Sequence, residues 1–190
     1  MSRSALMPKL ASLALVVAAL SASSAHATTQ LVEFNVLNAS ATLPNPLLGG
    51  DNLHLNTYVS TEVGALLQTI TFTLGADVTS LTGQAVWEIG TATGTGPRLI
   101  GVNIDIFNAA TNVLVTSDTF AGTLGGFAVS TFASAIGPGT YRMVATGTGV
   151  RDSSLDVTLS FVGAVPEPGT YAMMLAGVGL IGLLARRRRG

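Results

Sequence analysis

Residues 155–161 read Leu-Asp-Val-Thr-Leu-Ser-Phe, and this stretch decides the fold. An apolar residue stands at every second position, and a polar residue stands between each pair of them. Because successive side chains of a β-strand point to opposite faces, this period of two places all the apolar side chains on one face. The stretch therefore predicts a strand with one face in a hydrophobic core and the other toward solvent.

The same alternation recurs along the chain. It is clearest at 69–74, 102–107 and 141–146, and further strands are predicted at Leu31–Leu37, Leu53–Val59, Gln84–Ile89, Val113–Ser117 and Phe127–Phe132. Clusters of glycine and proline, such as Leu48-Gly49-Gly50-Asp51, separate the strands. Short strands at this spacing, about eight or nine of them, predict an all-β domain over residues 28–164. We expect an antiparallel β-sandwich of the jelly-roll type, with Ile70, Phe72 and Leu74 buried together in its core.

The composition excludes several kinds of site. The chain has 190 residues and no cysteine, so disulfides, thiolate metal sites and cysteine nucleophiles are excluded. Between Thr28 and Val165, three arginines stand against nine acidic residues, which gives this part a formal charge of −6. A net negative domain argues against binding to nucleic acid, whose phosphates attract basic proteins.

The first 27 residues have the three parts of a secretory signal peptide. Arg3 and Lys9 give a basic start, Leu10–Leu20 is apolar, and the segment ends in Ala25-His26-Ala27. Signal peptidase accepts small side chains at Ala25 and Ala27, so we predict a signal helix that is removed by cleavage after Ala27. The alternative is a retained anchor helix, which the short apolar run and the small-residue end disfavour.

Residues 165–190 form a second distinct segment. It begins with Val165-Pro166-Glu167-Pro168, continues as an uncharged run from Tyr171 to Ala185, and ends in Arg186, Arg187, Arg188 and Arg189. The run predicts a C-terminal transmembrane helix with a length of roughly 22 Å. The run has fewer residues than the ~20 of a usual membrane-spanning helix. By the positive-inside rule, the four arginines would act as a membrane stop and remain in the cytoplasm. We therefore expect a precursor held transiently in the inner membrane, with its β domain outside.

The order of Pro166-Glu167-Pro168, a short apolar helix and a terminal arginine cluster resembles the PEP-CTERM sorting signal of exported Gram-negative proteins. The resemblance covers the stretch from Val165 to Arg189. It implies that an exosortase, a membrane-embedded cysteine protease-transpeptidase, recognises the tail and cleaves near Pro-Glu-Pro. The alternative interpretation is an ordinary tail anchor preceded by a proline-containing linker.

The order of parts also resembles the FxDxF family of PEP-CTERM proteins. Gly139-Thr140-Tyr141 is similar to the late G-x-Y strand of that family. The early motif is degenerate, because His54-Leu55-Asn56-Thr57-Tyr58 has Asn in place of Asp and Tyr in place of the last Phe. Membership of this family implies no known activity.

No catalytic residue, metal site or cofactor is predicted. His54 is the one histidine left after signal removal, and no G-x-S-x-G motif accompanies it, so a surface histidine is the favoured interpretation. Four acidic residues are candidates for the carboxylate pair of a glycosidase, but we expect surface charges: Glu62, Glu88, Asp105 and Asp118. Trp87 lies in an apolar strand, which favours core packing over a sugar platform.

Calcium is the alternative ligand for an acidic β-sandwich, because hard cations take carboxylate and carbonyl oxygens. The loop-proximal candidates are Asp51, Asn52, Asp77, Asp152 and Asp156. None of them forms a D-x-D-x-D-G loop.

Three functions remain in competition. The leading one is a non-enzymatic protein of the cell surface or extracellular matrix, exported, sorted by its tail and associated with exopolysaccharide. The second is a carbohydrate- or calcium-binding module, which an exposed Trp87 or Tyr58 near Asp51 would favour. The third is an extracellular hydrolase, which requires a concave pocket with two carboxylates about 5–10 Å apart.

Overall fold

The computed structural model describes residues 27–60, 62–90, 98–164, 174–179 and 181, and within them the chain is almost entirely β-strand. The strands of this described part are β1 (Thr29–Phe34), β2 (Asn38–Thr42), β3 (Asn52–Val59), β4 (Gly64–Leu74), β5 (Val78–Glu88), β6 (Leu99–Asn108), β7 (Leu114–Ser117), β8 (Thr119–Leu124), β9 (Phe127–Ala135), β10 (Gly139–Gly149) and β11 (Ser153–Gly163).

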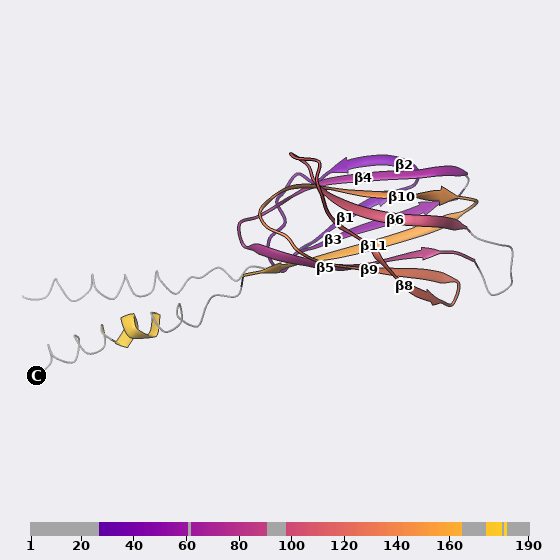
Figure 1. The fold of residues 1–190 in the computed structure, drawn as a ribbon. Coiled ribbons are helices and arrows are strands. Elements are labelled where there is room, and N and C mark those ends of the chain that lie inside the picture. Colours follow the sequence, from indigo (N-terminus) through magenta and orange to yellow (C-terminus); the bar gives the residue numbers. More distant parts are fainter. Residues whose placement is uncertain (1–26, 61, 91–97, 165–173, 180, 182–190) are drawn as a thin grey trace, which may run out of the picture.

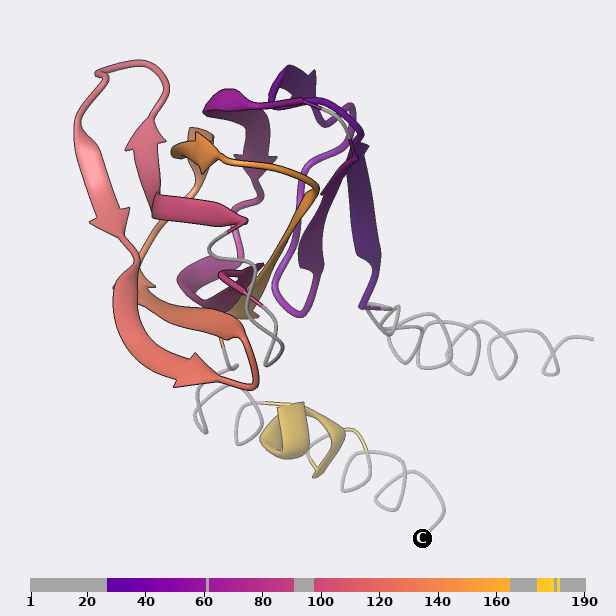
Figure 2. The same cartoon turned by 90° about the vertical axis from the view of Figure 1, so that its right-hand side faces the viewer.

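These strands form two sheets that enclose one core (Figures 1 and 2). The six-stranded sheet has the order β1-β3-β11-β5-β9-β8, and the five-stranded sheet has the order β2-β4-β10-β6-β7. Successive strands alternate between the sheets from β1 to β6 and again from β9 to β11, as they do in a jelly roll. The predicted all-β sandwich is therefore confirmed.

The prediction that the sandwich is antiparallel throughout is wrong, because both sheets are mixed. β1 runs parallel to β3, with Thr29 beside Asn52. β2 runs parallel to β4, with Asn38 beside Leu67. The first two strands are thus added in parallel to the edges of two antiparallel sets.

The alternating residues of β11 and β4 form the centre of the core, as predicted. Leu155, Val157, Leu159 and Phe161 are buried, and so are Ile70, Phe72 and Leu74. The rings of Phe72 in β4 and Phe161 in β11 lie 5.7 Å apart between their centroids, which joins the two sheets. Burial of such side chains provides roughly 1.5–3 kcal/mol each, and a cysteine-free domain depends on this contribution.

One polar pair lies inside this core. Thr57 of β3 and Gln68 of β4 are both buried, and the Thr57 hydroxyl donates to Gln68 Oε1 at 2.7 Å. The Gln68 amide donates in turn to the carbonyl oxygen of Val36 at 2.9 Å. These bonds satisfy the buried polar atoms and connect one sheet to the other.

The predictions for the two ends of the chain fall mostly outside the described residues. The signal helix over residues 1–27 does so except for Ala27, which is exposed just before β1. Of the apolar run from Tyr171 to Ala185, residues 174–179 and 181 are described as helical. Within the described part of the chain, no helix combines the length and apolar character needed to cross a membrane.

Candidate functional site

The last residues of β11 lead directly into the C-terminal segment, and the domain holds them at several points. The Ala164 amide donates to the Asp77 carbonyl oxygen at 2.7 Å. The Thr79 hydroxyl donates to the Val162 carbonyl oxygen at 3.2 Å. The chain is thus fixed to the start of β5 up to the residue before Val165.

The turn before β3 packs against this same point. A Cβ atom on Gly49 would lie 2.3 Å from the Cα atom of Gly163. The two backbones are therefore in contact, and a residue larger than glycine at position 49 would not fit. The Gly49 amide also donates to Asp77 Oδ2 at 2.8 Å. We call the group formed by Gly49, Asp77, Gly163 and Ala164 the tail root.

The N-terminal end of the domain is held beside the tail root by Asp51. Asp51 Oδ1 accepts hydrogen bonds from Thr28 N at 2.7 Å and from Thr28 Oγ1 at 2.8 Å. Asp51 Oδ2 accepts one from Leu48 N at 2.8 Å. The backbone continues the connection, because the Phe161 amide donates to the Asp51 carbonyl oxygen at 3.0 Å. The chain therefore enters and leaves the sandwich at the same end (Figure 1).

Burial and hydrogen bonding act in opposite directions on Asp51. The residue is 5% exposed, and this burial raises the pKa of the carboxyl group. The bonds from Leu48 and Thr28 favour the carboxylate and lower the pKa. The net pKa of Asp51 lies below its ordinary value, so the group is ionised at neutral pH.

A cleft of about 590 Å³ opens next to Thr28 and Asp51. Its wall is formed by β1 and by the segment between β2 and β3, with Leu31, Pro44 and Pro46 on the apolar side. Asp51 is the one carboxylate among its lining residues, and its oxygens are directed to backbone and hydroxyl donors. Among the described residues that line the cleft, there is thus no carboxylate pair of the kind that a glycosidase of the usual type needs.

The structure positions few of the residues predicted to act in processing. The sorting motif Val165, Pro166, Glu167 and Pro168, the stop residues Arg186, Arg187, Arg188 and Arg189, and the signal residue Ala25 lie outside the described residues. Ala27 is exposed and adjoins Thr28. Asp77 was predicted only as a calcium candidate. Its contacts with Gly49 and Ala164, and the contact of Asp51 with Thr28, were not predicted, because no local pattern reveals contacts between distant turns.

His54 lies on the outer face of the six-stranded sheet and is paired with Asp156. The atoms His54 Nε2 and Asp156 Oδ2 are 2.7 Å apart, and the side chains are 32% and 50% exposed. The Ser160 hydroxyl, four residues beyond Asp156 in β11, is bonded to Asn52. Thr158 is the residue paired with His54 in the register, but the hydrogen bond of the imidazole is to Asp156.

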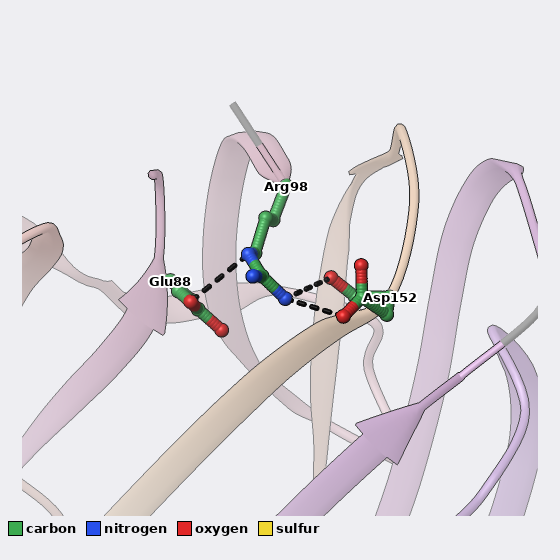
Figure 3. Close-up of polar contacts among 3 residues, drawn as sticks. All are labelled: Glu88, Arg98 and Asp152. Carbon is green, nitrogen blue, oxygen red and sulfur yellow. Dashed lines mark hydrogen bonds and ion pairs between the residues drawn. The ribbon is translucent and has the colours of Figure 1, made fainter. Parts of the chain in front are cut away.

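Each of the four candidate glycosidase carboxylates has a structural partner, and two of them, Asp105 in β6 and Asp118 directly after β7, lie at neighbouring positions. Glu62 accepts from Leu37 N, Asp118 from Ile104 N, and Asp105 from the Ser117 hydroxyl. Glu88 pairs with Arg98, whose guanidinium also contacts Asp152 (Figure 3). The Arg98 Nε to Glu88 Oε1 distance is 3.0 Å. This triad connects the end of β5 to the turn between β10 and β11.

The two aromatic candidates for a sugar site, Trp87 and Tyr58, do not form one with Asp51. Trp87 is 6% exposed and packs at a tilt against Phe120, so it belongs to the core as predicted. Tyr58 is exposed, but it lies near the end of β3 opposite to Asp51. No group of three or more potential metal-ligating His, Asp or Glu side chains gathers within the described residues.

Comparison with known proteins identifies the C-terminal segment. Residues 164–189 match the family model of the PEP-CTERM protein-sorting motif. No curated protein matches the chain. A solved structure similar to this one is the pre-peptidase C-terminal domain of a collagenase from Bacillus anthracis, with 9% identity, a TM-score of 0.37 and coverage of 71% of this chain and 97% of that one. The match at residues 164–189 falls on the predicted tail, and the chain is thus an exported protein that carries a PEP-CTERM protein-sorting motif, which implies processing by an exosortase.

Proposed function

We propose that the protein is a non-enzymatic component of the cell surface or extracellular matrix that associates with exopolysaccharide. The observation that supports this proposal is the direct junction between domain and motif. The matched motif begins at Ala164, which follows β11 immediately and is bonded to Asp77. Cleavage near Pro166-Glu167-Pro168 would release the sandwich with a few residues attached. The sandwich is then the cargo that the tail delivers.

The outer face of the five-stranded sheet offers a surface suited to uncharged sugars. Because Ile70, Phe72 and Leu74 point into the core, the threonines between them in β4 point outward. The register adds two neighbouring threonines from β2 and β10. This hydroxyl face consists of Thr42, Thr69, Thr71, Thr73 and Thr140. Each hydroxyl both donates and accepts hydrogen bonds, which suits the hydroxyls of a polysaccharide.

The first test is the intact mass of the protein recovered from a native-type host with and without its exosortase. We expect the mature chain to begin at Thr28 and to end near Pro168 when the exosortase is present. A chain that still ends in Arg189-Gly190 under both conditions would contradict the proposal. It would leave an inner-membrane protein with an external β domain.

The second test addresses the polysaccharide. The processed protein is sedimented with exopolysaccharide from the same host and compared with the triple variant Thr69→Val, Thr71→Val, Thr73→Val. Valine keeps the β-branched shape and removes the hydroxyls, so we expect cosedimentation to fall several-fold. The matched control replaces exposed Thr82 and Thr131 on the other sheet by Val and should bind as the unchanged protein does. Equal binding by all forms would refute the role of the hydroxyl face.

A further inference from the structure

Asp51 is a buried carboxylate whose donors among the described residues are all uncharged. Its three hydrogen bonds come from Thr28 N, Thr28 Oγ1 and Leu48 N. A buried carboxylate costs free energy unless a cation or several donors compensate the lost hydration. One of these donors, Thr28 N, belongs to the first residue after the predicted signal cleavage site, and this nitrogen can become a cation.

The basic side chains of the described domain are engaged elsewhere. The ion pairs of the described residues join His54 to Asp156 and Arg98 to Glu88 and Asp152. Arg142 donates to Asn112 and lies over the ring of Phe107. Arg151 belongs to the turn beside Asp152, at the end of β11 opposite to Asp51. No described basic side chain is found in an ion pair with Asp51.

Signal removal creates a cation at this position. Hydrolysis between Ala27 and Thr28 adds the hydroxyl of water to the Ala27 carbonyl carbon, and Thr28 N becomes an amine. The amine takes up a proton at neutral pH, because an α-amino group has an ordinary pKa of about 7.7–8.0. The nitrogen that already lies 2.7 Å from Asp51 Oδ1 thereby gains two further hydrogens and a positive charge.

We propose that Asp51 is the binding site for the α-ammonium group of Thr28 that export generates. The hydrogen bond from a neutral amide to the Asp51 carboxylate becomes an ion pair, in which the donor also carries a charge. The effect reaches the other end of the chain, since Asp51 O accepts from Phe161 N and Gly50 N donates to Phe161 O at 2.6 Å. Removal of the signal peptide thus stabilises the strand that carries the sorting tail.

This inference depends on export and on cleavage after Ala27, and it is independent of any association with exopolysaccharide. Intact mass separates the two. A mature chain that begins at a residue other than Thr28 overturns the binding site, whatever the polysaccharide experiment gives.

The chain offers an unusually selective probe. Its one lysine is Lys9, in the signal segment, so the Thr28 α-amino group is the sole amine of the mature chain. We would acetylate the processed protein with an amine-reactive acetyl ester and follow the reaction by intact mass. In the folded protein we expect modification at least tenfold slower than in urea, because the ammonium form that pairs with Asp51 does not react. Equal rates in both conditions would overturn the proposal.

Two variants separate charge pairing from general loosening. Asp51→Asn keeps the size and one acceptor but removes the charge, so it should restore rapid acetylation. Asp77→Asn is the matched control, because Asp77 accepts from Gly49 on the same turn without touching Thr28. Equal acceleration by both variants would refute the specific pairing.

A third measurement needs no substitution and decides the question if Asp51→Asn fails to fold. Wild-type protein is acetylated in urea, refolded and compared with the free-amine protein by urea unfolding. Acetylation leaves one N–H for Asp51 but removes the positive charge, and we expect the folding equilibrium constant to fall about tenfold or more because the buried carboxylate loses its cation. Equal stability of the two forms would overturn the proposal.

Discussion

Gly49 and Gly163 approach each other so closely that a Cβ atom on Gly49 would lie 2.3 Å from the Cα atom of Gly163. Neither backbone can move freely, because Gly49 is bonded to Asp77 and Ala164 is bonded to the Asp77 carbonyl. Gly49→Ala should therefore destabilise the processed protein by about 2–3 kcal/mol through overpacking. Urea unfolding followed by circular dichroism measures this loss.

Gly137→Ala is the control for that substitution. Nothing lies within 4 Å of a Cβ atom at this position, and the backbone does not require a left-handed conformation. We expect a change within about ±1 kcal/mol. Similar losses at both positions would show that the close approach of Gly49 to Gly163 does not limit stability.

Asp51 should make stability depend on pH in the acid range. Its folded pKa is below the unfolded value of about 3.9, so folding favours the carboxylate. The contribution is fully present above the unfolded pKa and is lost as pH falls through the folded pKa. At pH values below about 4, we expect the free energy of unfolding to decrease more steeply with decreasing pH in the wild type than in Asp51→Asn. Parallel pH profiles would contradict this assignment.

Substitution of Thr57, which is buried and bonded to Gln68, should lower the stability more than substitution of a surface threonine. Thr57→Val removes the donor to Gln68 Oε1 and leaves a buried acceptor without a partner, at a cost of about 1–3 kcal/mol. Adding Gln68→Leu should recover part of this loss, since both polar groups are then gone. Thr82→Val on the outer face is the control, with an expected change within about ±0.5 kcal/mol. A double variant less stable than the sum of the single variants would contradict the pairing.

Arg98 connects Glu88 and Asp152 at the end of the sandwich opposite to the tail root. Arg98→Met leaves two partly buried carboxylates without their cation, and we expect a loss of about 1–3 kcal/mol. Arg142→Met removes one hydrogen bond and the contact with Phe107 on the surface, for which about 0–1 kcal/mol is expected. Thermal unfolding of both variants at one pH compares them. Equal shifts in Tm would show that the triad adds nothing beyond a surface arginine.

The sequence allowed most strands to be predicted, because the burial of one face imposes a period of two on β4, β10 and β11. β2 and β8 were not predicted, because neither strand has the alternation of large buried and exposed residues. β2 reads Asn-Ala-Ser-Ala-Thr and has no large apolar residue, and β8 is an edge strand with no buried side chain. Parallel pairing of β1 and β2 depends on partners far along the chain, which a local pattern does not contain.

The sites divide along the same line. The sorting motif lies in one continuous stretch, so the order of its parts was enough to predict it. The pair of Asp51 with Thr28 and that of His54 with Asp156 join residues brought together by the fold. No spacing in the sequence announces such contacts, since they depend on the register of strands that are remote from each other.

The common entry and exit point has a consequence for how cargo is carried. Asp51 is hydrogen-bonded to both Thr28 and Phe161, so the two processing segments are attached to the sandwich at one point. Domains whose ends lie together tolerate insertion and exchange. Any other domain with adjacent ends, placed between Ala27 and Val165, should travel the same route, and the export signals would be reusable while the cargo changes.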